Sequence, residues 1–152
     1  MVIELFPVDA PVTVANFLAY VNADFYDQTL IHRVDRDFVA QGGGFRPGMV
    51  AKTPLFAPIQ LEDNTTLSNL RYTIAMARRS DPNSATSEWF FNTANNTSLD
   101  GVPGRRGYAV FGWIISGRPV LDAINIVPVY RYSDTDIQPR TEILVYWAQR
   151  IQ

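Results

Sequence analysis

The sequence contains no cysteine, and His32 is its only histidine. The absence of cysteine excludes disulfide bonds, thiol nucleophiles and thiolate metal ligands, but it leaves the redox compartment open. No H-E-x-x-H motif, cluster of zinc ligands or G-x-S-x-G elbow occurs, so we expect neither a metal site nor a hydrolase triad. The glycine run at 42–44 lacks the lysine and the spacing of a phosphate-binding loop and is more typical of a strand kink.

A large net charge and long apolar runs are also absent from the sequence. The formal net charge is -2, which gives no general attraction to phosphate backbones, so we expect no nucleic-acid partner. No apolar run approaches the roughly 20 residues that cross a bilayer, and the N-terminal segment MVIELFPVDAPVTV has no basic leader followed by an apolar stretch. We therefore expect a soluble protein with no membrane partner, which is cytoplasmic or, if a leader was removed, periplasmic.

What is present favours one folded unit. The chain has 152 residues, of which 47% are hydrophobic, 12% aromatic and 18% charged. This length fits one domain with a sizeable core, and the composition is not that of a disordered chain. We expect residues 1–152 to form a single domain, and the protein to be a monomer.

Hydrophobic patterning predicts many short strands separated by loops rich in Gly, Pro, Asn and Asp. The predicted strands cover residues 2–6, 30–34, 39–41, 59–61, 73–77, 89–92, 109–115 and 141–148. Many short strands with only two helices indicate an all-β barrel or sandwich rather than a βαβ fold.

Two helices are predicted. The first has Asp9 as its cap and Pro11 in its first turn, where a missing N–H is harmless. Its apolar residues recur at helical spacing: Val14, Phe17, Leu18 and Val21. The second covers residues 119–126, and the side chains predicted to face inward are Val120, Leu121 and Ile124.

Four segments carry a more specific signal. They read PVTVANFLAYVNADFYDQT (11–29), IHRVDRDFVAQGGGF (31–45), TIAMARRSDPNSATSEWFFN (73–92) and SLDGVPGRRGYAVFG (98–112). Together they closely resemble the cyclophilin family, particularly its bacterial branch, in order from about residue 2 to about residue 126. The pattern HRV-x3-F-x2-QGG, followed by MAR-x6-ATS and LDG with YAVFG, makes a chance match very improbable.

The resemblance implies a mainly β fold: a closed antiparallel eight-stranded barrel capped by two α-helices. The family's opening strand, roughly ten residues before Val2, is missing from this sequence. We therefore expect either a fragment of a longer protein or a barrel with an unpaired edge.

The resemblance also implies an activity, the peptidyl-prolyl cis/trans isomerisation of proline-containing polypeptides without a cofactor. The family's essential arginine matches Arg33. Gln41 matches the glutamine that holds the substrate backbone, and Ala77 and Arg78 match the segment whose main chain pairs with substrate. The proline pocket matches Phe38, Val39, Phe90, Leu99 and Tyr108.

Three positions depart from the family pattern. Glu88, a further predicted substrate-binding residue, stands in place of a glutamine; we expect its carboxylate to pair with Arg33, the alternative being that it points to solvent. Ser98 stands in place of an aromatic residue, so we expect weak or no binding of cyclosporin-like macrocycles. The turn at 35–37, Asp-Arg-Asp, replaces a proline-glycine turn.

Alternatives remain open for several of these residues. Taken singly, Arg33 would be a surface ion-pair residue and Phe90 a core residue. His32 is expected to be structural rather than a general base, because isomerisation moves no proton to a product. At the level of the whole chain, the alternatives are a proline-peptide-binding or chaperone module that does not turn substrate over, and a structural domain within a larger assembly.

Overall fold

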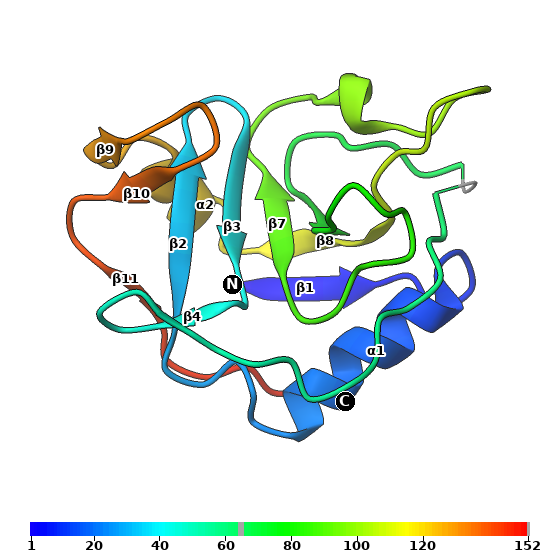
Figure 1. Ribbon diagram of the computed structural model, residues 1–152, viewed down its shortest axis with the longest axis horizontal. Helices are drawn as coiled ribbons and strands as arrows, with labels where there is room; N and C mark the ends of the chain where they lie inside the picture. The colour runs from blue at the N-terminus through cyan, green and yellow to red at the C-terminus, as the bar shows by residue number, and fades with distance from the viewer. Residues whose placement is uncertain (64–65, 152) are drawn as a thin grey trace.

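The computed structural model describes residues 1–63 and 66–151 and is built around one curled antiparallel sheet (Figure 1). The sheet has seven strands in the order β1-β8-β6-β7-β3-β2-β11. In that order they are β1 (Val2–Leu5), β8 (Val110–Ser116), β6 (Thr73–Met76), β7 (Trp89–Asn92), β3 (Val39–Gly42), β2 (Thr29–Asp35) and β11 (Ile143–Val145). Figure 1 shows β2, β3 and β7 upright and β1 nearly horizontal, which makes the curl of the sheet visible.

The remaining elements flank this sheet. Two small antiparallel pairs, β4 with β5 and β9 with β10, lie outside it. Their bounds are β4 (Phe45–Arg46), β5 (Val50–Ala51), β9 (Val129–Arg131) and β10 (Ile137–Pro139). The helices are α1 (Pro11–Asn22), α2 (Arg118–Asn125) and the short 3-10 helix η1 (Thr97–Leu99).

The prediction of a closed eight-stranded barrel is wrong for the described residues, although the mainly β class with two helices is confirmed. Closure requires the two outermost strands to be hydrogen-bonded to each other or bridged by another strand. Here β1 pairs only with β8 and β11 pairs only with β2. The sheet is therefore an open half-barrel with two edges.

Alternation along the strands divides the sheet into two faces, because successive strand residues point to opposite sides. One face is the main core, in which Ala40, Ile74 and Phe91 pack with residues of both helices. The other face carries a smaller cluster formed by Val39, Ala75, Phe90 and Val110. This second cluster is where the predicted site residues gather.

The helices match their predictions with two exceptions: Leu18 of α1, which is only partly buried, and Val120 of α2. Val14, Phe17 and Val21 are buried on α1, as the periodicity predicts. On α2, Leu121 and Ile124 are buried, but Val120 is 50% exposed because the buried stripe continues through Asn125 instead.

Several predicted strands are shorter than expected, and some elements were not predicted at all. The run at 59–61 makes one isolated bridge, from Ile59 to Ala85, and 141–148 contracts to β11. The short strands β4, β5, β9 and β10 carry no extended apolar alternation, so hydrophobic patterning does not predict them.

The cap predicted for α1 is also wrong. The residue before the helix is Ala10, and neither it nor Asp9 caps the helix with its side chain. Instead, the Glu62 carboxylate accepts hydrogen bonds from the backbone N–H of Val12 at 3.1 Å and of Thr13 at 2.8 Å, and from the Thr13 hydroxyl at 2.7 Å. A carboxylate there satisfies free N–H groups and complements the positive end of the helix dipole.

We expect Glu62→Ala to lower the free energy of unfolding by about 1–2 kcal/mol, because it leaves two backbone donors of α1 without their acceptor. Asp9→Ala is the matched control and should change stability by less than about 0.5 kcal/mol. Urea denaturation of both variants measures the two values. A larger loss for Asp9→Ala than for Glu62→Ala would contradict this assignment of the cap.

Candidate active site

Cross-strand register builds the site as one row of residues on the second face of the sheet. Arg33 on β2 lies opposite Gln41 on β3, Gln41 lies opposite Phe90 on β7, and Phe90 lies opposite Ala75 on β6. Directly opposed residues in antiparallel strands have side chains on the same face, close enough to interact. The row therefore places a cation, an amide and an aromatic ring side by side.

A cavity of about 130 Å³ opens over this row. It is lined by Arg33, Phe38, Val39, Gln41, Ala77, Arg78, Phe90, Leu99 and Tyr108. These are all the residues predicted for the site except Glu88. Segments separated by 75 residues of sequence, from Arg33 to Tyr108, thus meet at one place.

The floor and walls of the cavity are apolar. Val39 and Phe90 are buried, with 3% and 4% exposure, and the rings of Phe90 and Tyr108 meet edge to face with centroids 5.6 Å apart. Phe38 and Leu99 pack against the same cluster while remaining only partly buried. These side chains belong to a cluster separate from the main core, so they are available to line a small apolar pocket.

Arg33 stands at the polar side of the cavity and is held at both ends of its guanidinium. Its Nη1 donates to Gln41 Oε1 at 3.4 Å and its Nη2 donates to Asp35 Oδ2 at 3.2 Å, while Cζ lies 6.0 Å from the centre of the Phe38 ring. Its Nε is buried and has no acceptor among the described residues. A guanidinium keeps its charge at any physiological pH, so this side of the pocket presents a fixed positive charge.

Glu88 does not pair with Arg33, and that prediction is wrong. Its carboxylate accepts a hydrogen bond from Gln41 Nε2 at 2.7 Å and lies 3.4 Å from His32 Nε2. The Gln41 amide therefore stands between the carboxylate and the guanidinium, giving its oxygen to Arg33 and its N–H to Glu88. The alternative that Glu88 points freely to solvent is excluded by the same contacts.

Burial governs the ionisation of Glu88 and His32. Burial raises the pKa of Glu88, against the opposing effects of the Gln41 hydrogen bond and the Arg79 charge. Burial, with the Arg33 charge next, lowers the pKa of His32 from 6.5 to about 4, although Asp136 acts in the opposite direction. His32 is therefore neutral at pH 7. Its buried Nδ1 has no partner in the part of the chain that the structure describes, which favours the tautomer with hydrogen on Nε2, facing Glu88.

Arg78 lines the cavity and binds the main chain beside it. Its guanidinium donates to the carbonyl oxygens of Gly107 at 3.0 Å, Arg106 at 3.1 Å and Arg79 at 2.9 Å, and it lies 4.7 Å from the centre of the Tyr108 ring. The predicted role of the 77–78 main chain in pairing with a peptide remains a prediction. The Ala77 N–H cannot take part in it as the chain stands, because it donates to the Glu88 carbonyl at 3.0 Å.

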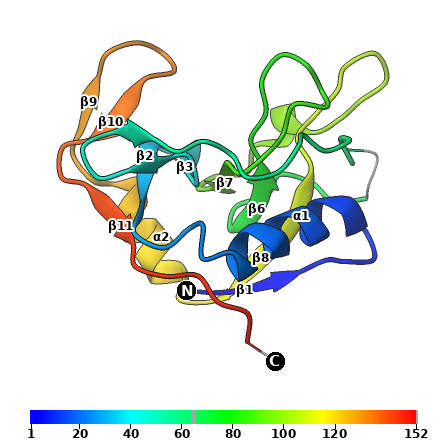
Figure 2. The same ribbon diagram turned by 60° about the horizontal axis from the view of Figure 1, so that its bottom comes forward.

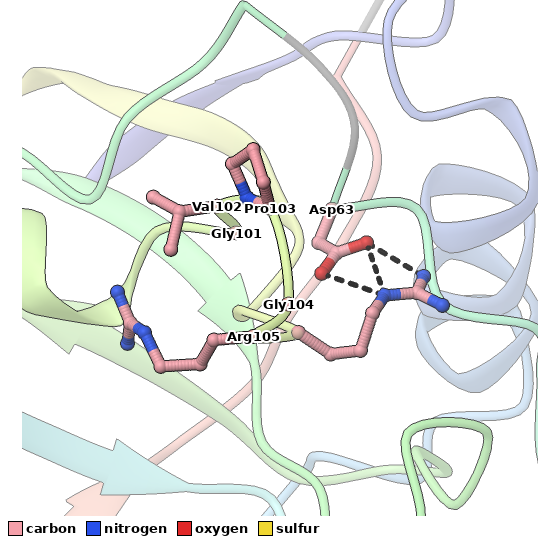
Figure 3. A pocket seen from close by; sticks show the side chains of 7 residues that line it. Asp63, Gly101, Val102, Pro103, Gly104 and Arg105 are labelled. Atoms are coloured by element: carbon pink, nitrogen blue, oxygen red, sulfur yellow. Dashed lines mark hydrogen bonds and ion pairs between the residues drawn. The ribbon is translucent and has the colours of Figure 1, made fainter.

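A second hollow, of about 530 Å³, lies beside the loop at 101–106 (Figure 3). Its charged groups bind one another or nearby main-chain groups. Asp63 accepts from Arg106 Nη2 at 2.6 Å and from the Gly107 N–H at 2.6 Å, and the Arg106 hydrogen bond lowers the pKa of the Asp63 carboxyl. Arg105 donates to the carbonyl oxygens of Ser98 and Asp100. Because these charged side chains already bind one another or the main chain of the same loop, the smaller cavity is the candidate site.

Sequence reasoning missed two residues next to the site. Asp35 was noted only as part of an unusual turn, although its spacing of two from Arg33 on a strand indicates a shared face. Arg131, which donates to Asp35 Oδ1 at 3.1 Å, gave no signal because it lies far along the chain. Within 1–63 and 66–151, no group of three potential metal ligands occurs and no helix has the length and apolarity to span a bilayer.

Comparison with known proteins points to one family. The family model described as "Cyclophilin type peptidyl-prolyl cis-trans isomerase/CLD" matches residues 1–146. The chain is 47% identical over 145 residues to a peptidyl-prolyl cis-trans isomerase of Streptomyces antibioticus, covering 91% of this chain and 87% of the relative. It is 40% identical over 149 residues to peptidyl-prolyl cis-trans isomerase B of Escherichia coli (strain K12), covering 95% and 90%.

A solved structure agrees with these relatives. The crystal structure of a Cryptosporidium parvum cyclophilin type peptidyl-prolyl cis-trans isomerase, obtained in the presence of the dipeptide Ala-Pro, superposes with a TM-score of 0.78 at 27% identity. The match covers 95% of this chain and 87% of that one. The overall fold is therefore shared with that structure.

The environment of His32 makes a testable prediction. We expect its imidazole to stay neutral down to a pH of about 4 instead of titrating near 6.5, because burial beside Arg33 penalises the cation. Its NMR signals are unambiguous since it is the only histidine. The urea-unfolded protein is the control, and its histidine should titrate near the ordinary value.

The same shift has a consequence for stability. Between these two pKa values the unfolded chain binds more protons than the folded one, so the free energy of unfolding should fall as the pH drops through that window, by at most about 3 kcal/mol. A folded-state midpoint near 6.5 for His32 would contradict both statements.

Proposed function

This chain belongs to the cyclophilin-type peptidyl-prolyl cis-trans isomerases, and we propose that Arg33, held beside the apolar cavity, is its catalytic residue. As a member of that family, the protein accelerates rotation about X–Pro bonds without a cofactor. One observation carries the proposal: the Arg33 guanidinium is fixed at the edge of a proline-sized apolar pocket. We further propose that residues 1–152 act as one such domain and that its substrates are proline-containing polypeptides.

The chemical task is modest in energy but slow without help. Amide resonance gives X–Pro rotation a barrier of about 18–20 kcal/mol, so the uncatalysed exchange takes tens of seconds or longer. Exchange in milliseconds requires lowering this barrier by roughly 5–6 kcal/mol, at about 1.4 kcal/mol for each tenfold change in rate. No bond between heavy atoms forms or breaks, so a fixed charge and a shaped pocket are sufficient.

Arg33 supplies the fixed charge. When the prolyl amide twists, resonance is lost and the nitrogen regains a lone pair that the planar amide does not have. A guanidinium N–H directed at that nitrogen stabilises the twisted amide more than the planar one, which is the condition for catalysis. The buried Nε of Arg33 supports this role because it has no acceptor among the described residues, and the prolyl nitrogen would supply the acceptor that it lacks.

The apolar cavity would hold the proline ring while the preceding carbonyl swings. Phe38, Val39, Phe90, Leu99 and Tyr108 form its walls. By excluding water they also strengthen the interaction between the guanidinium and the nitrogen, because charge interactions grow as the local dielectric falls. We propose that Gln41 and the main chain of Ala77 and Arg78 hold the flanking peptide.

A second candidate function is peptide binding without rapid turnover. The observation that favours it is the hydrogen bond from Gln41 Nε2 to Glu88 at 2.7 Å, which occupies the donor that would otherwise be offered to a substrate carbonyl. Ser98, which is exposed and does not line the cavity, also supplies no aromatic ring at its own position beside the cavity. Both features weaken peptide binding. We propose that they lower the peptide affinity of an isomerase that is still active.

We expect Arg33→Ala to lower kcat/KM by at least a factor of 100, or about 3 kcal/mol, with the fold intact, because Asp35 retains its bond from Arg131. A protease-coupled isomerisation assay on one proline peptide measures the effect. Arg36→Ala is the control and should behave as wild type, since its side chain is 70% exposed and outside the cavity. Near-wild-type turnover in Arg33→Ala would overturn the mechanism, while peptide affinity without turnover in the wild type would establish the binding module instead.

We also expect cyclosporin-like macrocycles to bind weakly to the unmodified protein. Aromatic anchors carry much of the binding energy at such surfaces, and Ser98 offers none. Ser98→Trp should tighten binding about tenfold or more by calorimetry, because it adds a ring beside Leu99, while Thr97→Trp on the same exposed turn should not. Nanomolar affinity in the wild type would show that this position does not decide macrocycle binding.

A further inference from the structure

A carboxylate on the same strand as Arg33 holds the other half of its guanidinium. We propose that Asp35 is a positioning residue for Arg33 in the isomerisation reaction, and that Arg131 from the β9–β10 hairpin fixes Asp35 in turn. This inference rests on the proposed function, since it assumes that Arg33 performs the catalysis.

Strand geometry brings the pair together. Arg33 and Asp35 are two residues apart on β2 and therefore point to the same face. They lie opposite Gln41 and Val39 of β3, both of which line the cavity. The Asp35 Oδ2 accepts the hydrogen bond from Arg33 Nη2 at 3.2 Å, and each of the two side chains is only 19% exposed. The contact is thus better shielded from water than a typical surface ion pair.

Asp35 is itself held from its other side. Its Oδ1 accepts a hydrogen bond from Arg131 Nη2 at 3.1 Å. In Figure 1, β9 and β10 lie beside the end of β2 where Asp35 is located. Each carboxylate oxygen therefore binds one guanidinium, and the three side chains together keep a charge of +1. The anchor fixes Arg33 without leaving the site neutral.

Gln41 and Asp35 each accept a hydrogen bond from a different nitrogen of the Arg33 guanidinium. Gln41 takes Nη1 through a hydrogen bond of 3.4 Å and Asp35 takes Nη2, which leaves Nε as the donor without a partner in the described residues. Because the guanidinium is planar, two bonded nitrogens fix the direction of the third. Without Asp35, only the longer bond to Gln41 and the contact with Phe38 would hold the group.

Loss of Asp35 should affect kcat and KM differently. The apolar walls of the cavity bind the proline ring and do not depend on Asp35, so KM should change little. The fraction of molecules with Nε correctly placed should fall, so kcat should fall, as small errors in placement have large effects on rate. The opposing view is that the carboxylate merely weakens the field of Arg33, in which case its removal would raise kcat.

The experiment compares kcat and KM of the wild type, Asp35→Ala, Asp35→Asn and Arg131→Gln on one proline peptide. We expect Asp35→Ala to lower kcat about tenfold or more with KM within about twofold, and Arg131→Gln to have a smaller effect of the same kind. Asp35→Asn should recover part of the rate, because its amide oxygen still accepts. If Asp35→Ala does not fold, Asp35→Asn provides the test, and its kcat should lie below that of the wild type.

Matched controls come from ion pairs and arginines outside the cavity. Asp122→Ala removes a carboxylate that pairs with Arg71 Nη2 at 2.9 Å, and Arg140→Gln changes an exposed arginine following β10. Both should retain wild-type kinetics. If kcat falls in these controls as much as in Asp35→Ala, the effect of Asp35→Ala is general destabilisation, and the proposal is overturned.

A double-mutant cycle separates this inference from the proposed function. If Asp35 acts through Arg33, the double variant Arg33→Ala/Asp35→Ala should be no slower than Arg33→Ala alone. The Arg33 Nε–Hε signal should also become more mobile by NMR relaxation in Asp35→Ala. An inactive Arg33→Ala together with an unchanged or faster Asp35→Ala, or with additive losses, would overturn the positioning role alone. An active Arg33→Ala would overturn the proposed mechanism as well.

Discussion

The site depends above all on the register of four antiparallel strands, β2, β3, β7 and β6. That register aligns Arg33, Gln41 and Phe90 in one row, and the hydrophobic core enforces it from the opposite face. Ala40 and Phe91, the neighbours of the row, are almost completely buried against the helices. A shift of the strand register by one residue would turn Ala40 and Phe91 toward the cavity. It would turn Arg33, Gln41 and Phe90 toward the core. Burial of the core therefore specifies the geometry of a site on the other side of the sheet.

The polar residues beside the row form a continuous chain of alternating partners. Glu88 binds Gln41, Gln41 binds Arg33, Arg33 binds Asp35, and Asp35 binds Arg131. Such a network is stabilising only when nearly every member is satisfied, because an unpaired polar group in a shielded place is costly. The exception is Nε of Arg33. We propose that this unsatisfied donor is the one that binds the prolyl nitrogen of the substrate.

The sequence predicted the residues of the site far better than their partners. The resemblance to the cyclophilin family identified every residue that lines the cavity. Prediction from the sequence failed where contacts join distant segments: Glu62 rather than Asp9 caps α1, and Arg131 reaches Asp35 across 96 positions. Local pattern likewise could not reveal that Gln41 stands between Glu88 and the guanidinium. Nor could the resemblance predict an open sheet, because closure depends on strand pairing at the edges and not on the pattern within each strand.

The turn between β2 and β3 shows how a departure in sequence can be accommodated. Asp37 adopts a left-handed conformation, with φ of 56°, where glycine is usual and aspartate is among the few tolerated residues. Asn125 of α2 braces it, accepting from the Asp37 N–H at 2.8 Å and donating to its carboxylate at 2.9 Å. The turn closes with the Phe38 N–H donating to the Asp35 carbonyl at 3.1 Å. One braced turn therefore places both Asp35, the anchor of Arg33, and Phe38, a wall of the pocket, and it makes α2 part of the support of the site.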